Sequence, residues 1–458
     1  MITFAVLVIF AASLVFYLMG RSKAIAASGG TFASLHSRPS YHGTYSALWA
    51  LLVGLLLVVV VSIVWGRLND SALMASILQS QPDMSKIEAE LVLADAKSIA
   101  SGNIASKSDE LRTQIAAQAG SSETARLWGT LIISVLGAIL AGLFTNRQLT
   151  RDFRARNRAE KIIVAVLMGC AVIAILTTIG IVLSLIFETL RFFNQIDWQI
   201  WKFLFGTTWS PLSGVQDGML DADKVGAAPL FVGTFMITII AMLVAVPIGL
   251  FAAIYLSDFA SPKVRAWAKP MLEVLAGIPT VVYGFFAAIT VAPYIRKAGE
   301  SMGLSVASES ALAAGVVMGI MIIPFISSLS DDVINAVPQS LRDGSYGLGA
   351  TKAETIRQVV LPAALPGIVS AVLLGVSRAV GETMIVVMAA GQGANLTANP
   401  LEAVTTVTVQ IVMLITGDTE ASTAAGPAFT LGFTLFCITL GLNVVALKVV
   451  RKYREQYD

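Results

Sequence analysis

Two opposite charges lie deep inside an apolar segment near the carboxyl end of the chain. Arg378 and Glu382 are four positions apart, and Thr383 follows directly. Counting ~1.5 Å per residue from Pro366, the arginine lies roughly 18 Å into a hydrocarbon layer of ~30 Å. An arginine at that depth costs at least ~2.5–3.5 kcal/mol, so it indicates a functional site.

The chemistry that suits Arg378 is recognition of a tetrahedral oxyanion, because a guanidinium donates two parallel hydrogen bonds from a planar fork. We expect Arg378 to attract the anion during its passage, Glu382 to limit how tightly it is held, and Thr383 to offer a hydroxyl contact. Residues four apart share one face of a continuous helix, so Arg378 and Glu382 could also neutralise one another. The alternative function is a structural ion pair that clamps two helices or two subunits. No catalytic residue and no metal site are expected.

The elements around these residues are expected to be membrane helices. Hydrophobic residues make up 56% of the chain and charged residues 13%, and the mean hydropathy is +0.78. Continuous apolar runs without strict alternation favour helices over a barrel. The sequence predicts an all-α polytopic bundle of about nine transmembrane helices, near 2–19, 44–65, 128–145, 162–187, 229–256, 270–293, 309–328, 364–389 and 426–447.

The charges between the spans predict the topology. A basic carboxyl-terminal tail, with Lys448 and Arg451 among its cations, is expected in the cytoplasm, and an odd number of spans then places the amino terminus outside. The polar segment 66–127 is predicted to be a helical loop on the outer side, with helical spacing at Ile87, Leu91 and Ala94. The short apolar stretch 401–416 is interpreted as an interfacial or re-entrant piece.

The inward loop between the seventh and eighth predicted spans, residues 338–362, encodes a helix, a turn and a second helix. Gly347 and Gly349 supply the permissive backbone of the turn. Thr351 and Glu354 have the spacing of a capping box, in which each side chain bonds an amide at the start of the second helix. A rigid helix pair at the cytoplasmic face is a suitable handle for a partner that generates movement.

This loop resembles the EAA loop of bacterial ABC importer permeases. The family pattern has an acidic residue and two small ones, a glycine six residues after the acid, and a final branched aliphatic, one residue, Leu and Pro. The chain departs from it with Asp-Gly-Ser in place of Glu-Ala-Ala, and the closing proline is also expected to end the second helix. The matching residues are Asp343, Gly344, Ser345, Gly349, Val359, Leu361 and Pro362.

The resemblance implies the core of a type I ABC importer permease over residues 161–458. Its loop at 338–362 would couple to a separate ATPase subunit. Residues 1–160 would form an amino-terminal extension with about three transmembrane helices and the outer loop 66–127. The chain has no Gly-x-x-x-x-Gly-Lys-Ser/Thr phosphate loop, so ATP would be hydrolysed by the partner and no cofactor would be bound here. The implied location is the bacterial inner membrane.

Further motifs resemble the phosphate permeases of the PstC and PstA type, and the long PstC proteins in particular. These are the run from Gly381 to Met384 and the stretches 229–234, 246–249 and 277–284. The resemblance implies a second, PstA-like permease subunit, a PstB-like ATPase dimer and a PstS-like periplasmic phosphate-binding protein. Three alternatives stay open: a permease for molybdate or sulfate, an ion-coupled secondary transporter, and a membrane scaffold or sensor.

Overall fold

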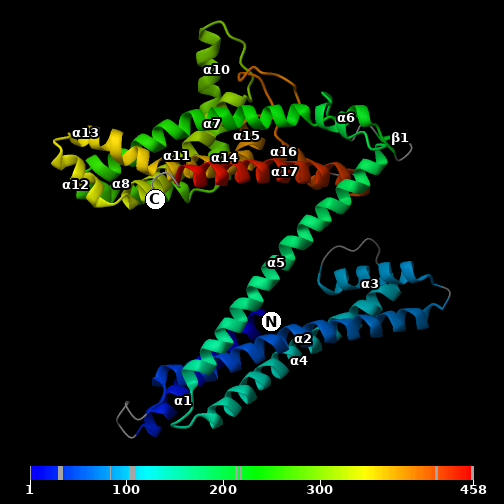
Figure 1. Ribbon diagram of the computed structural model, residues 1–458. Helices are drawn as coiled ribbons and strands as arrows, with labels where there is room; N and C mark the ends of the chain where they lie inside the picture. Colours follow the sequence, from blue (N-terminus) through cyan, green and yellow to red (C-terminus); the bar gives the residue numbers. More distant parts are fainter. Residues whose placement is uncertain are drawn as a thin grey trace. The chain divides into compact units, whose positions relative to one another are not determined.

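The structure of the protein is a computed structural model that describes residues 2–28, 35–82, 84–102, 109–211, 215–216, 219–417 and 421–454. It consists of two compact units, Met1–Leu176 and Thr177–Asp458. The sequence places the domain boundary between residues 160 and 161, within α5 (Ala155–Gln195), the helix that passes from one unit into the next (Figure 1).

The first unit is built from long helices that lie side by side (Figure 1). These are α1 (Ile2–Ala27), α2 (Pro39–Ser80) and α4 (Glu110–Gln148). Small residues allow the close approach: a Cβ added to Gly43 of α2 would lie 2.5 Å from the carbonyl oxygen of Tyr17 on α1. Because tight backbone contact of this kind has a single good arrangement, the unit is expected to be rigid.

The ends of α2 and α4 combine with α3 (Lys86–Ala100) into a polar three-helix head, residues 66–126. Within this range, residues 83 and 103–108 lie outside the described residues. The predicted helix at Ile87 and Leu91 is present, but both side chains are exposed. Its buried face carries a different set instead: Ala89, Val92, Leu93 and Ala96.

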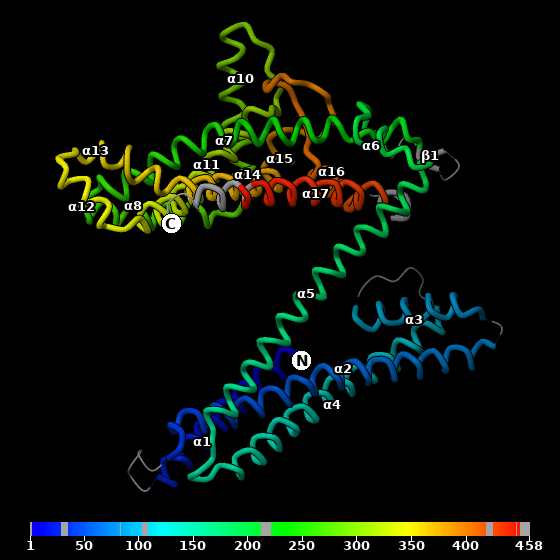
Figure 2. The backbone as a smooth tube through the Cα atoms, in the orientation of Figure 1, coloured from blue at the N-terminus to red at the C-terminus, as the bar shows by residue number. Residues whose placement is uncertain are grey.

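The second unit contains the carboxyl half of α5 and a series of shorter elements (Figures 1 and 2). Its entry consists of α6 (Ile200–Phe205), the two-residue strands β1 (Val215–Gln216) and β2 (Met219–Leu220), and the 3₁₀ turn η2 (Ala222–Lys224). The following elements are α7 (Ala228–Ile254), η3 (Tyr255–Phe259), α8 (Pro262–Ala276), α9 (Thr280–Phe286), η4 (Ala287–Val291), α10 (Ala292–Ser301), α11 (Ala311–Ala336), α12 (Gln339–Gly347), α13 (Lys352–Thr355), η5 (Ile356–Val360), α14 (Leu361–Val380), α15 (Met384–Ala389), α16 (Val407–Thr416) and α17 (Ala421–Arg454).

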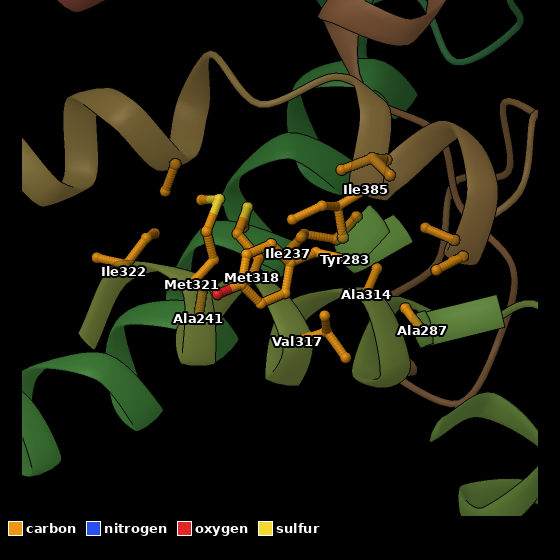
Figure 3. Packing of buried hydrophobic residues seen from close by; sticks show 14 of the residues in the cluster. Ile237, Ala241, Tyr283, Ala287, Ala314, Val317, Met318, Met321, Ile322 and Ile385 are labelled. Atoms are coloured by element: carbon orange, nitrogen blue, oxygen red, sulfur yellow. The ribbon is translucent and has the colours of Figure 1, made fainter. Parts of the chain in front are cut away.

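The core of the second unit lies between α7 and α11. Ile237 of α7 and Met318 of α11 belong to one buried cluster, and Figure 3 shows Tyr283 of α9 and Ile385 of α15 in the same cluster. A Cβ added to Gly319 would lie 2.8 Å from the carbonyl oxygen of Ala241. The helices therefore meet at backbone distance. In Figure 2, α12 and α13 lie at one end of this bundle, and α6 and β1 lie at the other end.

The predicted all-α membrane fold with about nine membrane-length spans is confirmed, since the described strands are limited to the two-residue pair β1 and β2. Eight described helices are long and apolar enough to cross a membrane, and a bent pair is a ninth candidate. That pair corrects the sixth span, predicted as continuous over 270–293: α8 and the helix Thr280–Ser301 meet at 87°. The break at Gly277–Pro279 is reasonable because proline lacks an amide hydrogen and glycine ends helices readily.

Candidate functional site

Arg378 lies in the last turn of α14, where a cation interacts favourably with the negative end of the helix dipole. Its side chain is exposed in the isolated chain, and its guanidinium carbon lies 5.9 Å from the centre of the Phe325 ring. No ion pair of Arg378 occurs within the part of the chain that the structure describes. The arginine is therefore available to an outside anion or to a carboxylate of another chain.

Glu382 does not share a continuous helix with Arg378, which corrects the predicted span 364–389. The helix α14 ends at Val380, and the Glu382 side chain accepts hydrogen bonds from the backbone amides of Met384 (3.0 Å) and Ile385 (3.4 Å). This carboxylate caps the short helix α15. The interpretation of Arg378 and Glu382 as a paired helix face is wrong, because the backbone turns at Gly381 between them.

Thr383 is the residue that immediately precedes α15, and its carbonyl oxygen accepts a hydrogen bond from the Val387 amide at 2.9 Å. The Glu382 carbonyl oxygen accepts from the Thr408 hydroxyl of α16 at 2.9 Å. The break at 381–383 is thus held by α16, which is formed from the stretch interpreted as interfacial or re-entrant. Arg378, Glu382 and Thr383 all lie at the break.

The loop 338–362 has the predicted turn and cap. Gly349 has a φ of +85°, the left-handed conformation that favours glycine, between α12 and α13. The Thr351 hydroxyl accepts from the Glu354 amide (3.3 Å) while the Glu354 carboxylate accepts from the Thr351 amide (2.8 Å). The two helices are joined by a 2.9 Å hydrogen bond between the hydroxyls of Ser345 and Thr355. The capping box predicted from spacing is confirmed.

The expected end of the second helix at Pro362 is wrong. The helix runs from α13 through the wider turn η5 into α14, so residues 352–380 form one helical segment. In η5 the Leu361 amide donates to the carbonyl of Ile356, five residues earlier. A single-turn π-bulge of this kind lets a helix absorb an extra residue and change its local geometry. The loop is therefore joined directly to the helix that ends at Arg378.

The remaining motif residues divide between these elements. Asp343 accepts a hydrogen bond from the Gln339 side chain at 3.0 Å on α12, where Gly344 also lies. Val359 lies in η5 and Leu361 begins α14. At the tip, Leu348 is 91% exposed. An apolar side chain so fully exposed beside two glycines is suited to contact with another protein.

A buried ion pair that the sequence did not reveal lies behind the loop. Arg342 of α12 donates to the Asp258 carboxylate in η3, and the two side chains are 9% and 8% exposed. The same guanidinium donates to the carbonyl oxygen of Ile334 at 2.8 Å. The available signal was Asp258, an acidic residue directly after a long apolar run. Its partner lies 84 positions away, so local spacing could not identify it.

Two separate segments of the chain match known protein families. Residues 6–177 match a family described as phosphate ATP-binding cassette transporter. Residues 245–455 match the inner membrane component of binding-protein-dependent transport systems. The second match includes the loop 338–362, Arg378 and Glu382.

Curated relatives agree with these families. The probable ABC transporter permease protein YqgH of Bacillus subtilis is 34% identical over 291 residues, covering 63% of this chain and 90% of the relative. The phosphate transport system permease protein PstC of Mesorhizobium japonicum is 30% identical over 314 residues, covering 64% and 88%. Among solved structures, the inward-facing MetNI methionine ABC transporter matches at 20% identity with a TM-score of 0.39, covering 50% of this chain and 95% of the matched one.

Proposed function

Since the chain belongs to the PstC family of ABC transporter permeases, we propose that it forms, with a second permease subunit, the membrane path of an ATP-driven importer of inorganic phosphate. The geometry of the loop 338–362 carries this proposal. A capped helix pair with an exposed apolar tip is rigid enough to transmit force and accessible enough to receive it. The match of residues 6–177 to a phosphate transporter family and the similarity to PstC support phosphate as the substrate.

Coupling to the ATPase would use the loop as a lever with two attachments. One is covalent, because α13, η5 and α14 are continuous up to Arg378. The other is the buried pair of Arg342 with Asp258, which fixes α12 to η3, the wide turn that follows α7. Closure of an ATPase dimer around Leu348 would move both attachments together, in keeping with the rigid-body transitions that switch access in transporters.

The substrate path would include Arg378, Glu382 and Thr383. An exposed guanidinium without an ion pair in the described part of the chain supports recognition of an anion better than a closed ion pair within the chain. Because the Glu382 carboxylate caps α15, its negative charge is held near the break, where it would keep the anion from binding too tightly. The second permease would complete the path on the exposed side of α14.

The proposed assembly contains a PstA-like second permease, two copies of a PstB-like ATPase and a PstS-like periplasmic phosphate-binding protein. ATP would be used by the ATPase, and no covalent chemistry would occur on this chain, so no catalytic residue is proposed. The location would be the bacterial inner membrane, with the carboxyl terminus in the cytoplasm and the amino terminus outside. Residues 1–160 would be the extension and 161–458 the permease domain.

The test is phosphate uptake in vesicles that contain the reconstituted complex. Uptake should require the ATPase subunit and ATP, and Arg378→Gln should lower it by at least about tenfold, the effect of losing ~1.4 kcal/mol of anion stabilisation. The matched control is Arg296→Gln, at an exposed arginine paired with Glu300. Transport driven by an ion gradient alone would contradict the importer. A normal rate in Arg378→Gln would contradict the path role of Arg378, and sulfate or molybdate uptake would correct the substrate.

A second measurement tests the coupling surface. Leu348→Asp should weaken binding of the ATPase subunit, because a charge replaces the exposed apolar tip, while the folded permease keeps its stability. Leu304→Asp is the control, at another exposed leucine outside the loop. Equal binding of the ATPase by the two variants would remove Leu348 from the interface.

A further inference from the structure

The helix α8 differs from its neighbours in how it is attached to the second unit. None of its side chains is buried, and its apolar residues Trp267, Met271 and Val274 are exposed. It also lies between two breaks, the wide turn η3 before it and the 87° bend after it. Helix segments bounded by such irregularities are free to move as a body unless side chains fix them.

The buried carboxylate of Asp331 is the centre of the polar contacts between α8 and α11. Asp331 is 2% exposed, and both of its side-chain oxygens accept from one guanidinium nitrogen of Arg265 at 3.1 Å. Lys269 donates to the same carboxylate at 3.0 Å, and the Asn335 amide donates at 2.8 Å. Arg265 and Lys269 both belong to α8. A buried carboxylate is stable only when nearby cations balance its charge and donors satisfy its oxygens, as they do here.

Hydrogen bonds also connect the contacts around Asp331 to the loop 338–362. Asn335 also accepts hydrogen bonds on its side-chain oxygen, from Ser257 of η3 at 3.3 Å and from Arg265 at 3.4 Å. The preceding residue, Ile334, accepts from Arg342 of α12. The helix α12 therefore bonds α11 directly at Ile334. It also bonds Asp258 of η3, whose neighbour Ser257 bonds Asn335, and Asn335 in turn bonds Asp331.

Beside this cluster lies a cavity of about 230 Å³ between α8, η3 and α11. Lys269 and Asp331 line it, together with Phe325, whose ring lies next to Arg378. Ser327 lines it too; this residue is almost fully buried, and its hydroxyl finds no hydrogen-bond partner among the described residues. A buried hydroxyl beside a cavity gains a hydrogen-bond partner if the wall of the cavity moves and water or a polar group enters.

We propose that Asp331 is a latch that holds α8 against α11 and that the loop 338–362 releases it during the transport cycle. Release would let α8 turn about its two breaks and open the cavity next to Arg378. The latch has two discrete states, because a carboxylate in this position is either fully bonded or must be hydrated. Asp331 acts as a positioning residue for α8. This inference rests on the coupling role proposed above for the loop.

The test uses a cysteine reporter in the full reconstituted complex. Ser327→Cys places a thiol in the wall of the cavity, in a background in which Cys170→Ala and Cys437→Ala remove the exposed native thiols. The readout is the rate of labelling by a hydrophilic thiol reagent, with and without nucleotide. Asp331→Asn should raise this rate at least about tenfold without nucleotide and abolish its nucleotide dependence, because the buried pair is lost. Phosphate moved per ATP hydrolysed should fall.

Asp332→Asn is the matched control. Asp332 is the adjacent residue, its side chain is 64% exposed, and among the described residues its one ion pair is with Lys269, at 3.2 Å. Labelling should stay within about twofold of the parent, as expected for an exposed ion pair. Lys269→Gln is a milder variant that leaves Arg265 on Asp331, and it should raise labelling about threefold if Asp331→Asn prevents assembly.

The outcomes separate this inference from the proposed function. Unchanged labelling and normal phosphate uptake in Asp331→Asn, or equal effects of Asp331→Asn and Asp332→Asn, would overturn the latch while leaving the importer intact. Faster labelling in Asp331→Asn, with the nucleotide dependence lost, would support the latch even if the transported anion were not phosphate.

Discussion

The helices of the two units differ in how they are built and packed. In the first unit, α2 and α4 run for 42 and 39 residues without a break, and glycines bring the backbones together. The described part of the second unit contains three wide π-turns, an 87° bend and the break at 381–383. It also buries the charged groups Asp331 and Arg342. Long continuous contact favours one arrangement, whereas breaks joined by ionic contacts allow two.

The largest effect is expected at the buried ion pair of the second unit. Arg342→Gln leaves the Asp258 carboxylate buried without its cation, which should lower the free energy of unfolding by ~3–5 kcal/mol. The measurement is denaturant or thermal unfolding of the purified complex in detergent. Arg156→Gln is the control in the first unit, where both side chains of the pair with Glu160 are exposed (62% and 48%), and it should cost at most ~1 kcal/mol. Equal losses would contradict the contrast between the units.

The next effect tests the close packing of the first unit. Gly43→Ala should lower its free energy of unfolding by ~1–3 kcal/mol, because the added methyl group meets the Tyr17 carbonyl oxygen at 2.5 Å and the backbone must shift. Gly120→Ala is the matched control in the same unit, since an added Cβ there has no neighbour within 4 Å. If the two variants unfold alike, close contact of α1 and α2 does not stabilise this unit.

Each unit contains a helix that begins with a capping box, so the effect of losing the cap, about 1 kcal/mol, can be compared between the two units. Ser85 with Glu88 begins α3, and Thr351 with Glu354 begins α13. Replacing either hydroxyl residue by alanine should cost its own helix ~1 kcal/mol of local stability, measurable by hydrogen exchange. Only Thr351→Ala should also reduce transport per ATP hydrolysed. A similar transport defect in Ser85→Ala would show that the first unit takes part in coupling.

The smallest effect is the acid sensitivity of the polar head. Hydrogen bonds from the backbone amide and then the hydroxyl of Ser85 lower the pKa of Glu88 below its ordinary value of 4.5, and the backbone amide of Arg112 lowers the pKa of Asp109 below 3.8. A lowered pKa contributes stability that is present above the ordinary value and is lost as the pH falls through the lowered one. The protection factors of α3 amides, which correct for the pH dependence of intrinsic exchange, should therefore fall on acidification, and Glu88→Gln should flatten this dependence.

The locally encoded parts of the fold and site were predictable. Membrane-length helices follow from apolar runs, and the turn at Gly349 and the cap at Thr351 follow from residues within a few positions of each other. The loop residues from Asp343 to Pro362 were found through a spacing that the family shares. The errors occurred where local rules allow two results: Pro362 ends many helices, but here the wide turn η5 allows the helix to continue past it.

The sequence by itself determined that this chain is a membrane helical protein with a capped loop and an arginine deep in an apolar segment, because composition and short-range spacing encode each of these. Only the tertiary structure decided the partners of the charges. Asp258 meets Arg342 and Asp331 meets Arg265 and Lys269 across 62 to 84 positions of sequence. Such pairs depend on the path of the whole chain, and burial makes them strong because water no longer competes for the charges.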